Sequence, residues 1–278
     1  MFLLKIYPKA KNNVPKITLS SRYSNYAEKL LYFAQTNKFE GIEYSILSET
    51  GKHLKTEYQI MKKLAESDLE IRYHMPYKTI ELAHGDTVHA ENSVQYFKEC
   101  IDLINLLGGR YAIVHLGLGY RYSLQKLNFQ HALKNLERVV AYGIKKNITI
   151  CLENLTFGFT SNPTTFLNIL ENTGASAAID IGHVVSSPVV INGNVTAENF
   201  IFEVLPFIKS AHVYDKEVTE KETLDTFHTA PQDKEDVLSR LGVLLQSDCD
   251  WWLIELGDAK EILQTTSFAR DILSNSLI

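Results

Sequence analysis

Residues 148–183 read ITICLENLTFGFTSNPTTFLNILENTGASAAIDIGH, and this stretch contains one complete strand–helix–strand unit. An apolar run (148–155) is followed by a helical pattern (163–172) and a second apolar run (176–182). Because parallel strands need a long crossover, usually a helix, this order predicts two neighbouring parallel strands. The second run closes on Asp180 and His183, and a buried polar group without a partner costs about 1–3 kcal/mol. We therefore expect a metal ion, a substrate or a buried side chain as their partner.

The same alternation extends along the chain. The predicted strands are 16–20, 41–47, 70–76, 111–117, 148–155, 176–182, 208–215 and 251–258. The predicted helices are 24–37, 56–67, 91–107, 128–146, 163–172, 196–206, 232–247 and 259–274. This series of strand–helix pairs predicts an α/β fold, a single (β/α)8 TIM barrel domain over residues 1–278. An open doubly wound sheet is the alternative, but no GxGxxG or GxxxxGK[ST] motif follows the first strand, so its usual nucleotide-binding use has no support.

The composition is that of a globular chain with a mildly acidic charge. The 278 residues are 45% hydrophobic and carry a net charge of −5, and no apolar run reaches the roughly 18–20 residues of a membrane-spanning helix. An acidic chain without basic runs disfavours nucleic acid as a partner. Cys100, Cys151 and Cys249 are far apart, which argues against disulfides and a thiolate zinc site. The N-terminus lacks the order of a signal peptide, so we expect a cytoplasmic protein.

Polar side chains close most of the predicted strands. They are Glu43, His74, His115, Glu153, Asn154, Asp180, His183, His212, Asp215 and Glu255. Each has a structural interpretation: His115 as a hydrogen-bonded core histidine, for example, or Asp215 as part of a solvated turn. In a barrel, however, the carboxyl ends of all strands meet at one face. Carboxylates and imidazoles gathered there predict a site for a divalent ion such as Mn²⁺, Co²⁺, Mg²⁺ or Zn²⁺.

An ordered series of short motifs resembles the xylose isomerase-like barrels. The motifs are HMP (74–76), VHLG (114–117), LENL (152–155), DIGH (180–183), HVYD (212–215) and IELG (254–257). That superfamily includes sugar and sugar phosphate isomerases and epimerases, inosose dehydratase, and abasic-site nucleases of the endonuclease IV type. The resemblance runs from about residue 16 to 274.

The resemblance implies roles for individual residues. In the epimerase-like members, the matching positions hold one divalent ion; here they are Glu153, Asp180, His212 and Glu255. The two glutamates also exchange the substrate proton. The histidine of DIGH contacts substrate hydroxyl groups, and the expected substrate contacts are His74, His115, His183, Asp215 and His228. In the nuclease, the histidines matching His74, His115 and His183 belong to a multinuclear zinc cluster.

The chain departs from the family pattern at three places: the first puts one loop in doubt, and the other two, with the acidic net charge, favour the small-molecule branch over the nuclease. The segment 227–237, FHTAPQDKEDV, keeps His228 but lacks the glycine-rich turn of many relatives. Asp225 and His228 are three apart, whereas the nuclease has an Asp-x-His pair. Gly182 stands where the nuclease has a cysteine. The role of residues 217–231 therefore stays open.

The expected reaction is isomerisation or epimerisation of a sugar, a sugar phosphate or a polyol derivative. The ion would polarise the carbonyl and stabilise an enediolate, while Glu153 and Glu255 remove and return the proton. The alternatives are zinc-dependent cleavage of abasic DNA and a barrel that binds a ligand without turnover. The expected partner is a small sugar-like molecule, with no membrane, and a homo-oligomer stays open.

Overall fold

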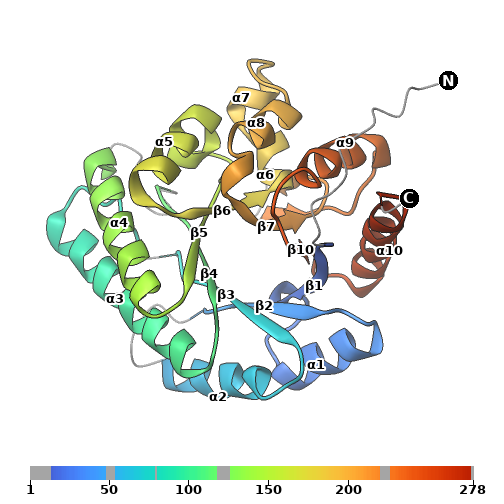
Figure 1. The fold of residues 1–278 in the computed structure, drawn as a ribbon, viewed down its shortest axis with the longest axis horizontal. Helices are drawn as coiled ribbons and strands as arrows, with labels where there is room; N and C mark the ends of the chain where they lie inside the picture. The colour runs from blue at the N-terminus through green and yellow to red at the C-terminus, as the bar shows by residue number, and fades with distance from the viewer. Residues whose placement is uncertain (1–13, 48–53, 79, 118–125, 220–225, 277–278) are drawn as a thin grey trace.

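The parallel strands of the structure close into a barrel. The computed structural model describes residues 14–47, 54–78, 80–117, 126–219 and 226–276. Neighbouring strands pair in the order β1-β10-β7-β6-β5-β4-β3-β2 and back to β1. They are β1 (Lys16–Ser20), β2 (Gly41–Ser45), β3 (Glu70–His74), β4 (Tyr111–Val114), β5 (Thr149–Glu153), β6 (Ser176–Asp180), β7 (Ile208–Val213) and β10 (Trp251–Ile254). The predicted TIM barrel is confirmed (Figure 1).

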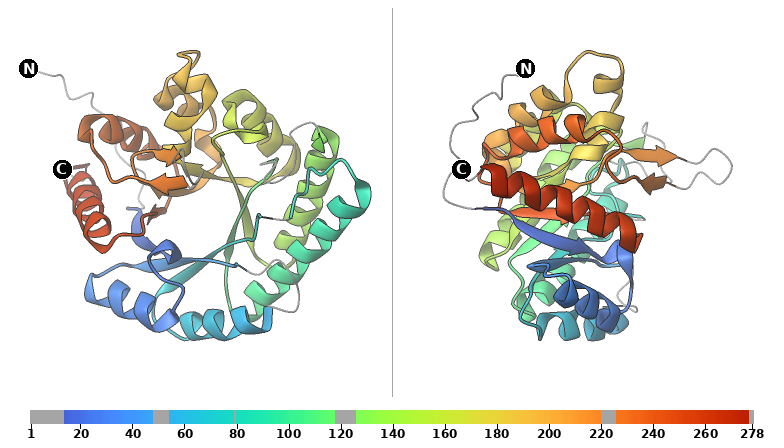
Figure 2. Two further views of the ribbon diagram at one scale, coloured as in Figure 1. Left: turned by 180° about the vertical axis from the view of Figure 1, so that it is seen from behind. Right: turned by 90° about the vertical axis from the view of Figure 1, so that its right-hand side faces the viewer.

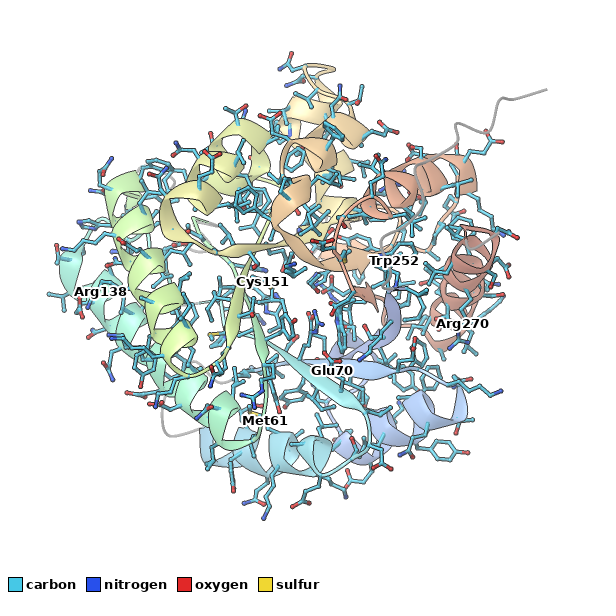
Figure 3. All side chains as sticks on the ribbon, viewed as in Figure 1. Met61, Glu70, Arg138, Cys151, Trp252 and Arg270 are labelled. Carbon is cyan, nitrogen blue, oxygen red and sulfur yellow. The ribbon has the colours of Figure 1, made fainter. Side chains whose placement is uncertain are left out.

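Helices form an outer ring around these strands (Figure 1). They are α1 (Ala27–Thr36), α2 (Leu54–Ala65), α3 (Thr87–Leu106), α4 (Phe129–Lys145), α5 (Pro163–Thr173), α8 (Ala197–Glu203), α9 (Lys234–Leu244) and α10 (Ala259–Ser276). The first predicted unit, residues 148–183, is β5–α5–β6. In Figure 3, Arg138 and Arg270 lie at the rim, whereas Cys151 lies near the centre. No helix in the described part of the chain is long and apolar enough to cross a membrane.

Several strands are shorter than predicted, and Asp180 shows why. Its Oδ1 accepts a hydrogen bond of 2.7 Å from the backbone N–H of His183, which caps the short helix α6 (Ile181–Ser186). Helix α7 (Pro188–Ile191) follows. The DIGH motif is therefore the last residue of a strand and the first turn of a helix, because a side-chain oxygen at the N-cap satisfies an otherwise free N–H group.

Helix α3 begins four residues before its predicted start at residue 91. Asp86 caps it, because Oδ1 accepts hydrogen bonds from the N–H groups of Val88 (2.8 Å) and His89 (3.1 Å). The predicted end is correct: Gly108 has φ +78°, a left-handed conformation that glycine adopts without strain. The predicted start followed the apolar period of the helix and did not use Asp86, a residue type that commonly caps a helix N-terminus.

A two-stranded hairpin follows β7. Strand β8 (Glu217–Thr219) pairs antiparallel with β9 (Thr226–His228), and Figure 2 (right) shows the hairpin projecting from the barrel. Glu217 and His228 are directly opposed in the ladder. The hairpin falls within the 217–231 segment whose structure the sequence did not predict, and it places a carboxylate beside a histidine.

Arg72 fills the end of the barrel opposite the polar strand ends. Its side chain is 1% exposed, and its guanidinium stacks between the rings of Tyr111 (3.7 Å) and Trp251 (4.3 Å). It donates hydrogen bonds to Asp250 (2.8 Å) and Glu70 (3.0 Å). A planar fork that is both stacked and hydrogen-bonded suits arginine and not lysine.

We expect Arg72→Ala to lower the free energy of unfolding by about 2–4 kcal/mol, because it removes a buried, stacked guanidinium and leaves the partly exposed Asp250 without its ion-pair partner. Arg72→Lys should recover only part of this loss, because the ammonium cannot stack as the guanidinium does. Urea denaturation measures both. The control is Arg138→Ala, whose ion pair with Glu91 lies on the surface and should matter little. Equal losses for Arg72→Ala and Arg138→Ala would contradict the assigned role of Arg72.

Candidate active site

The C-terminal end of the barrel gathers five of the protein's nine histidines together with five carboxylates. Each of the barrel strands β2, β3, β5, β6 and β7 ends with, or carries near its end, one of these groups. The full set is Glu43, His74, His115, Glu153, Asp180, His183, His212, Glu217, His228 and Glu255. The structure thus brings together the predicted residues, with the exception of Asp215, and adds Glu217.

The central group is formed by Glu153, Asp180, His212 and Glu255, the predicted ligands of one ion. The imidazole Nδ1 of His212 lies 3.1 Å from Glu255 Oε2, 3.6 Å from Glu153 Oε1 and 3.7 Å from Asp180 Oδ2. Candidate ligand atoms of Glu153, Asp180 and His212 all lie within 4.8 Å of one another. These distances are compatible with donors surrounding one cation.

Three buried polar atoms of the central group favour a cation as their common partner. Asp180 Oδ2, Glu255 Oε2 and His212 Nδ1 are buried, and none has a hydrogen-bond partner among the described residues. Burying carboxylate oxygens without a partner is costly, and a divalent ion would satisfy all three atoms at once. The donor set of carboxylates with one imidazole fits Mn²⁺, Co²⁺, Mg²⁺ or Zn²⁺.

A second group shares Glu153 with the first. The Nε2 atoms of His74 and His115 lie 3.0 and 3.1 Å from Glu153 Oε2, and 3.1 Å from each other. His74 Nδ1 lies 2.9 Å from the carbonyl oxygen of Met75. If that nitrogen carries the proton, Nε2 is free to act as a ligand. Glu153 therefore turns one oxygen toward each of two histidine-containing groups.

A third group is built by α6 and the hairpin. Glu217 Oε2 lies 3.2 Å from His183 Nε2 and 3.8 Å from His228 Nε2. The Nδ1 atoms face backbone carbonyls, that of Asn154 at 3.0 Å for His183 and that of Glu255 at 2.9 Å for His228. Both Nε2 atoms are thus directed at one carboxylate. Sequence reasoning missed Glu217, and Asp225, the acidic residue considered there, lies outside the described residues.

Gly182 and Tyr214 fix how the third group is packed. The Tyr214 ring stacks on the His228 imidazole with centroids 3.7 Å apart and planes 4° from parallel. A Cβ atom at Gly182 would lie 2.1 Å from this ring. The glycine in DIGH is therefore required by the close approach of Tyr214, which in turn holds His228 in place.

Asp215 is the predicted site residue that lies elsewhere. Its Oδ1 lies 3.3 Å from Arg240 Nη2, and its backbone oxygen accepts a hydrogen bond of 2.8 Å from Arg240 Nη1. This buried pair joins the end of β7 to α9. The predicted substrate contact of Asp215 stays a prediction, whereas its contact with Arg240 supplies a structural role.

Attraction between the carboxylates and the imidazoles sets the protonation states of several groups in the site. Burial alone would lower the pKa of His183, but Asp180, Glu217 and Glu153 raise it to about 10. Burial also opposes charge on His212, yet Glu153, Glu43 and Glu255 hold its pKa well above the usual value. Conversely, histidines keep the pKa values of Glu153 and Glu255 well below the usual range despite burial, with Arg22 adding to the effect on Glu255. A cation entering the site must therefore displace protons from imidazoles.

The model of the xylose isomerase-like TIM barrel family matches residues 31–259 of the chain. An uncharacterized protein of Methanocaldococcus jannaschii, MJ0008, is 28% identical over 211 residues, which cover 76% of this chain and 84% of the relative. It shares sequence over most of both chains, and its name assigns no activity.

Solved structures share the fold at low sequence identity. A D-tagatose 3-epimerase-like protein has a TM-score of 0.70 at 15% identity, covering 94% of this chain and 98% of its own. D-allulose 3-epimerase from Methylomonas sp. gives 0.69 at 15%, covering 96% and 99%. L-ribulose 3-epimerase gives 0.66 at 16%, covering 95% and 94%.

We expect the ion-free protein to lose stability as the pH rises from about 6.5 to about 10. The pKa of His183 is about 10 in the fold against an ordinary value of 6.5, so its contribution is complete below pH 6.5 and is lost as the pH rises through about 10. The slope from this one group is at most about 1.4 kcal/mol per pH unit. Urea unfolding in the presence of a chelator measures it.

The control for this measurement is His183→Gln, which should reduce the slope. Added Mn²⁺ should reverse the trend, because fewer protons compete with the ion at higher pH. A chelated protein whose stability increases between pH 6.5 and 10 would contradict the assigned charge state.

Proposed function

The chain belongs to the xylose isomerase-like TIM barrel family, and on that premise we propose that it is a divalent-metal-dependent isomerase or epimerase. Its substrate would be a sugar, a sugar phosphate or a polyol derivative with a carbonyl beside a hydroxyl group. The observation that carries this proposal is the central group, in which Glu153 and Glu255 both approach His212 Nδ1. The fold's likeness to sugar 3-epimerases supports the same class of reaction.

The bound ion would supply a Lewis acid that polarises the substrate carbonyl and so acidifies the neighbouring C–H bond. Glu153 and Glu255 are the residues that would move the proton. Both carboxyl groups have lowered pKa values, so either is ionised and can accept the proton from the carbon. The other, once it has taken up a proton from solvent or from the substrate hydroxyl group, would return that proton, either to the opposite face of the same carbon in an epimerase or to the next carbon in an isomerase.

The surrounding histidines would bind and orient the substrate. The Nε2 atoms of His74 and His115 lie 3.0 and 3.1 Å from Oε2 of Glu153, and these contacts fix the plane of that carboxylate. His183 and His228 belong to the third group, together with Glu217. Arg22 donates from Nε to Glu255 Oε1 at 3.0 Å and so orients the second glutamate. A fixed geometry of this kind raises the rate because no reorganisation is needed during proton transfer.

A second candidate function is hydrolysis of a phosphodiester, as in the abasic-site nucleases. The observation that favours it is the presence of two further groups, His74–His115–Glu153 and His183–Glu217–His228. With Arg22 charged and every imidazole neutral, three divalent ions would make the site positive in spite of its five carboxylates. Such a positive cluster would clamp a phosphate and activate water.

We expect Glu153→Gln and Glu255→Gln each to lower kcat at saturating Mn²⁺ by about 10²–10⁴-fold, because each removes one proton-transfer group. Turnover is followed on a panel of ketohexoses and their phosphates, with deuterium uptake from D₂O detected by NMR. A variant that lacks only the returning acid should still exchange deuterium from the face of the remaining base. The control is Glu57→Gln, a buried glutamate that bonds Tyr44 outside the site. Full metal-dependent turnover in both site variants would rule out the two-glutamate mechanism.

Elemental analysis of the purified protein distinguishes the two candidate functions. The isomerase or epimerase predicts one exchangeable divalent ion per chain, and His74→Ala should leave that number unchanged while weakening substrate binding. The nuclease predicts about three zinc ions, the loss of one on His74→Ala, and salt-sensitive cleavage of abasic DNA. A single ion together with inert abasic DNA would exclude the second candidate.

A further inference from the structure

Glu43 is a buried carboxylate that the proposed reaction does not use. It lies on β2, and its residue is 2% exposed. Among the described residues, its Oε2 has no hydrogen-bond partner, and no lysine or arginine side chain forms an ion pair with it. Burying an ionised carboxylate lowers the stability of the fold unless a charged or hydrogen-bonding partner offsets its lost hydration.

The close polar contact of Glu43 is with His212. Glu43 Oε1 lies 3.1 Å from His212 Nε2, whereas His212 Nδ1 faces the other way, toward Glu255 Oε2 at 3.1 Å and Asp180 Oδ2 at 3.7 Å. The imidazole is fully buried and makes no aligned hydrogen bond through either nitrogen within the described chain. Its orientation therefore rests on charged groups at both edges of the ring.

We propose that Glu43 is a positioning residue for His212: it holds the proton on Nε2 and so presents the lone pair of Nδ1 to a divalent ion in the central group. This proposal deepens the proposed function, because it rests on that group binding an ion. A neutral imidazole can donate to a metal from only one nitrogen when the other carries the hydrogen. A carboxylate behind a ligating histidine fixes both the tautomer and the ring, and makes the ligand nitrogen more basic.

Packing alone does not account for a glutamate at this position. A glutamine has nearly the same shape, and a methionine has a similar length without the polar atoms, so either could fill the space. Both would avoid the desolvation of a carboxylate. The carboxylate is therefore expected to act through the proton and the orientation of His212 and not through the space that it fills.

The experiment measures Mn²⁺ binding to wild type, Glu43→Gln and Glu43→Met by titration with detection of free Mn²⁺ by electron paramagnetic resonance. We expect the affinity to fall by about 10–100-fold in Glu43→Gln, and further in Glu43→Met, which cannot accept a hydrogen bond. In the ion-free protein both variants lose the attraction between Glu43 and protonated His212, so urea unfolding serves only to confirm that each variant folds cooperatively. Glu57→Gln is the matched control, because Glu57 is also buried but bonds Tyr44, and it should bind Mn²⁺ as wild type does.

A double-mutant cycle tests whether the effect of Glu43 on Mn²⁺ affinity depends on His212. It also distinguishes that dependence from a general folding defect, which would lower the affinity equally with and without His212. In a His212→Gln background, the Glu43→Gln substitution should change the affinity by less than about 2-fold, because the group that it positions is gone. Unchanged Mn²⁺ affinity in Glu43→Gln, or an equal loss with and without His212, would overturn the proposal.

The outcomes also separate this proposal from the proposed function. Wild-type protein that binds Mn²⁺ but turns over no sugar would overturn the isomerase or epimerase reaction and leave the role of Glu43 standing if the affinities follow the expected order. Turnover by wild type with unchanged Mn²⁺ affinity in Glu43→Gln would overturn the role of Glu43 alone.

Discussion

The structure depends most on the burial of many like charges at one end of the barrel, and Glu153 is where this constraint is strongest. Its two oxygens face different groups, one with His74 and His115 and the other with His212 and Asp180. Carboxylates packed this closely repel one another unless cations lie between them. In the ion-free protein these cations include the protonated imidazoles of His183 and His212, and a metal ion would take over the same role.

The two ends of the barrel solve the same electrostatic problem in different ways. At the N-terminal end, Arg72 is a permanent cation, sandwiched by Tyr111 and Trp251 and hydrogen-bonded to Asp250 and Glu70. At the C-terminal end, the cations include His183 and His212 beside Arg22, and the two histidines can release their protons. The first arrangement closes the barrel interior and contributes stability. The second arrangement provides imidazole nitrogens that can exchange a proton for a metal ion, which a site for an ion and a substrate needs.

The sequence predicted the barrel and most of the site because both follow from local patterns. Alternating strands and helices imply parallel pairing, and parallel pairing brings His74, Glu153 and His212 to one face. Glu217 was not predicted, because it lies in a three-residue strand without an apolar period, and only the ladder places it opposite His228. The early end of β6 was missed for a related reason: Asp180 both ends the strand and caps a helix.

The bridging position of Glu153 limits how many tasks the site can perform at once. A carboxylate that removes a proton from carbon needs a free lone pair directed at the substrate. If ions occupied both the central group and the His74–His115–Glu153 group, each oxygen of Glu153 would bind an ion, and its remaining lone pairs would be less basic toward a proton on carbon. A site with one ion would therefore favour proton transfer, whereas a filled cluster would favour activation of water. The reaction would thus follow from the number of ions that His74 and His115 allow beside Glu153.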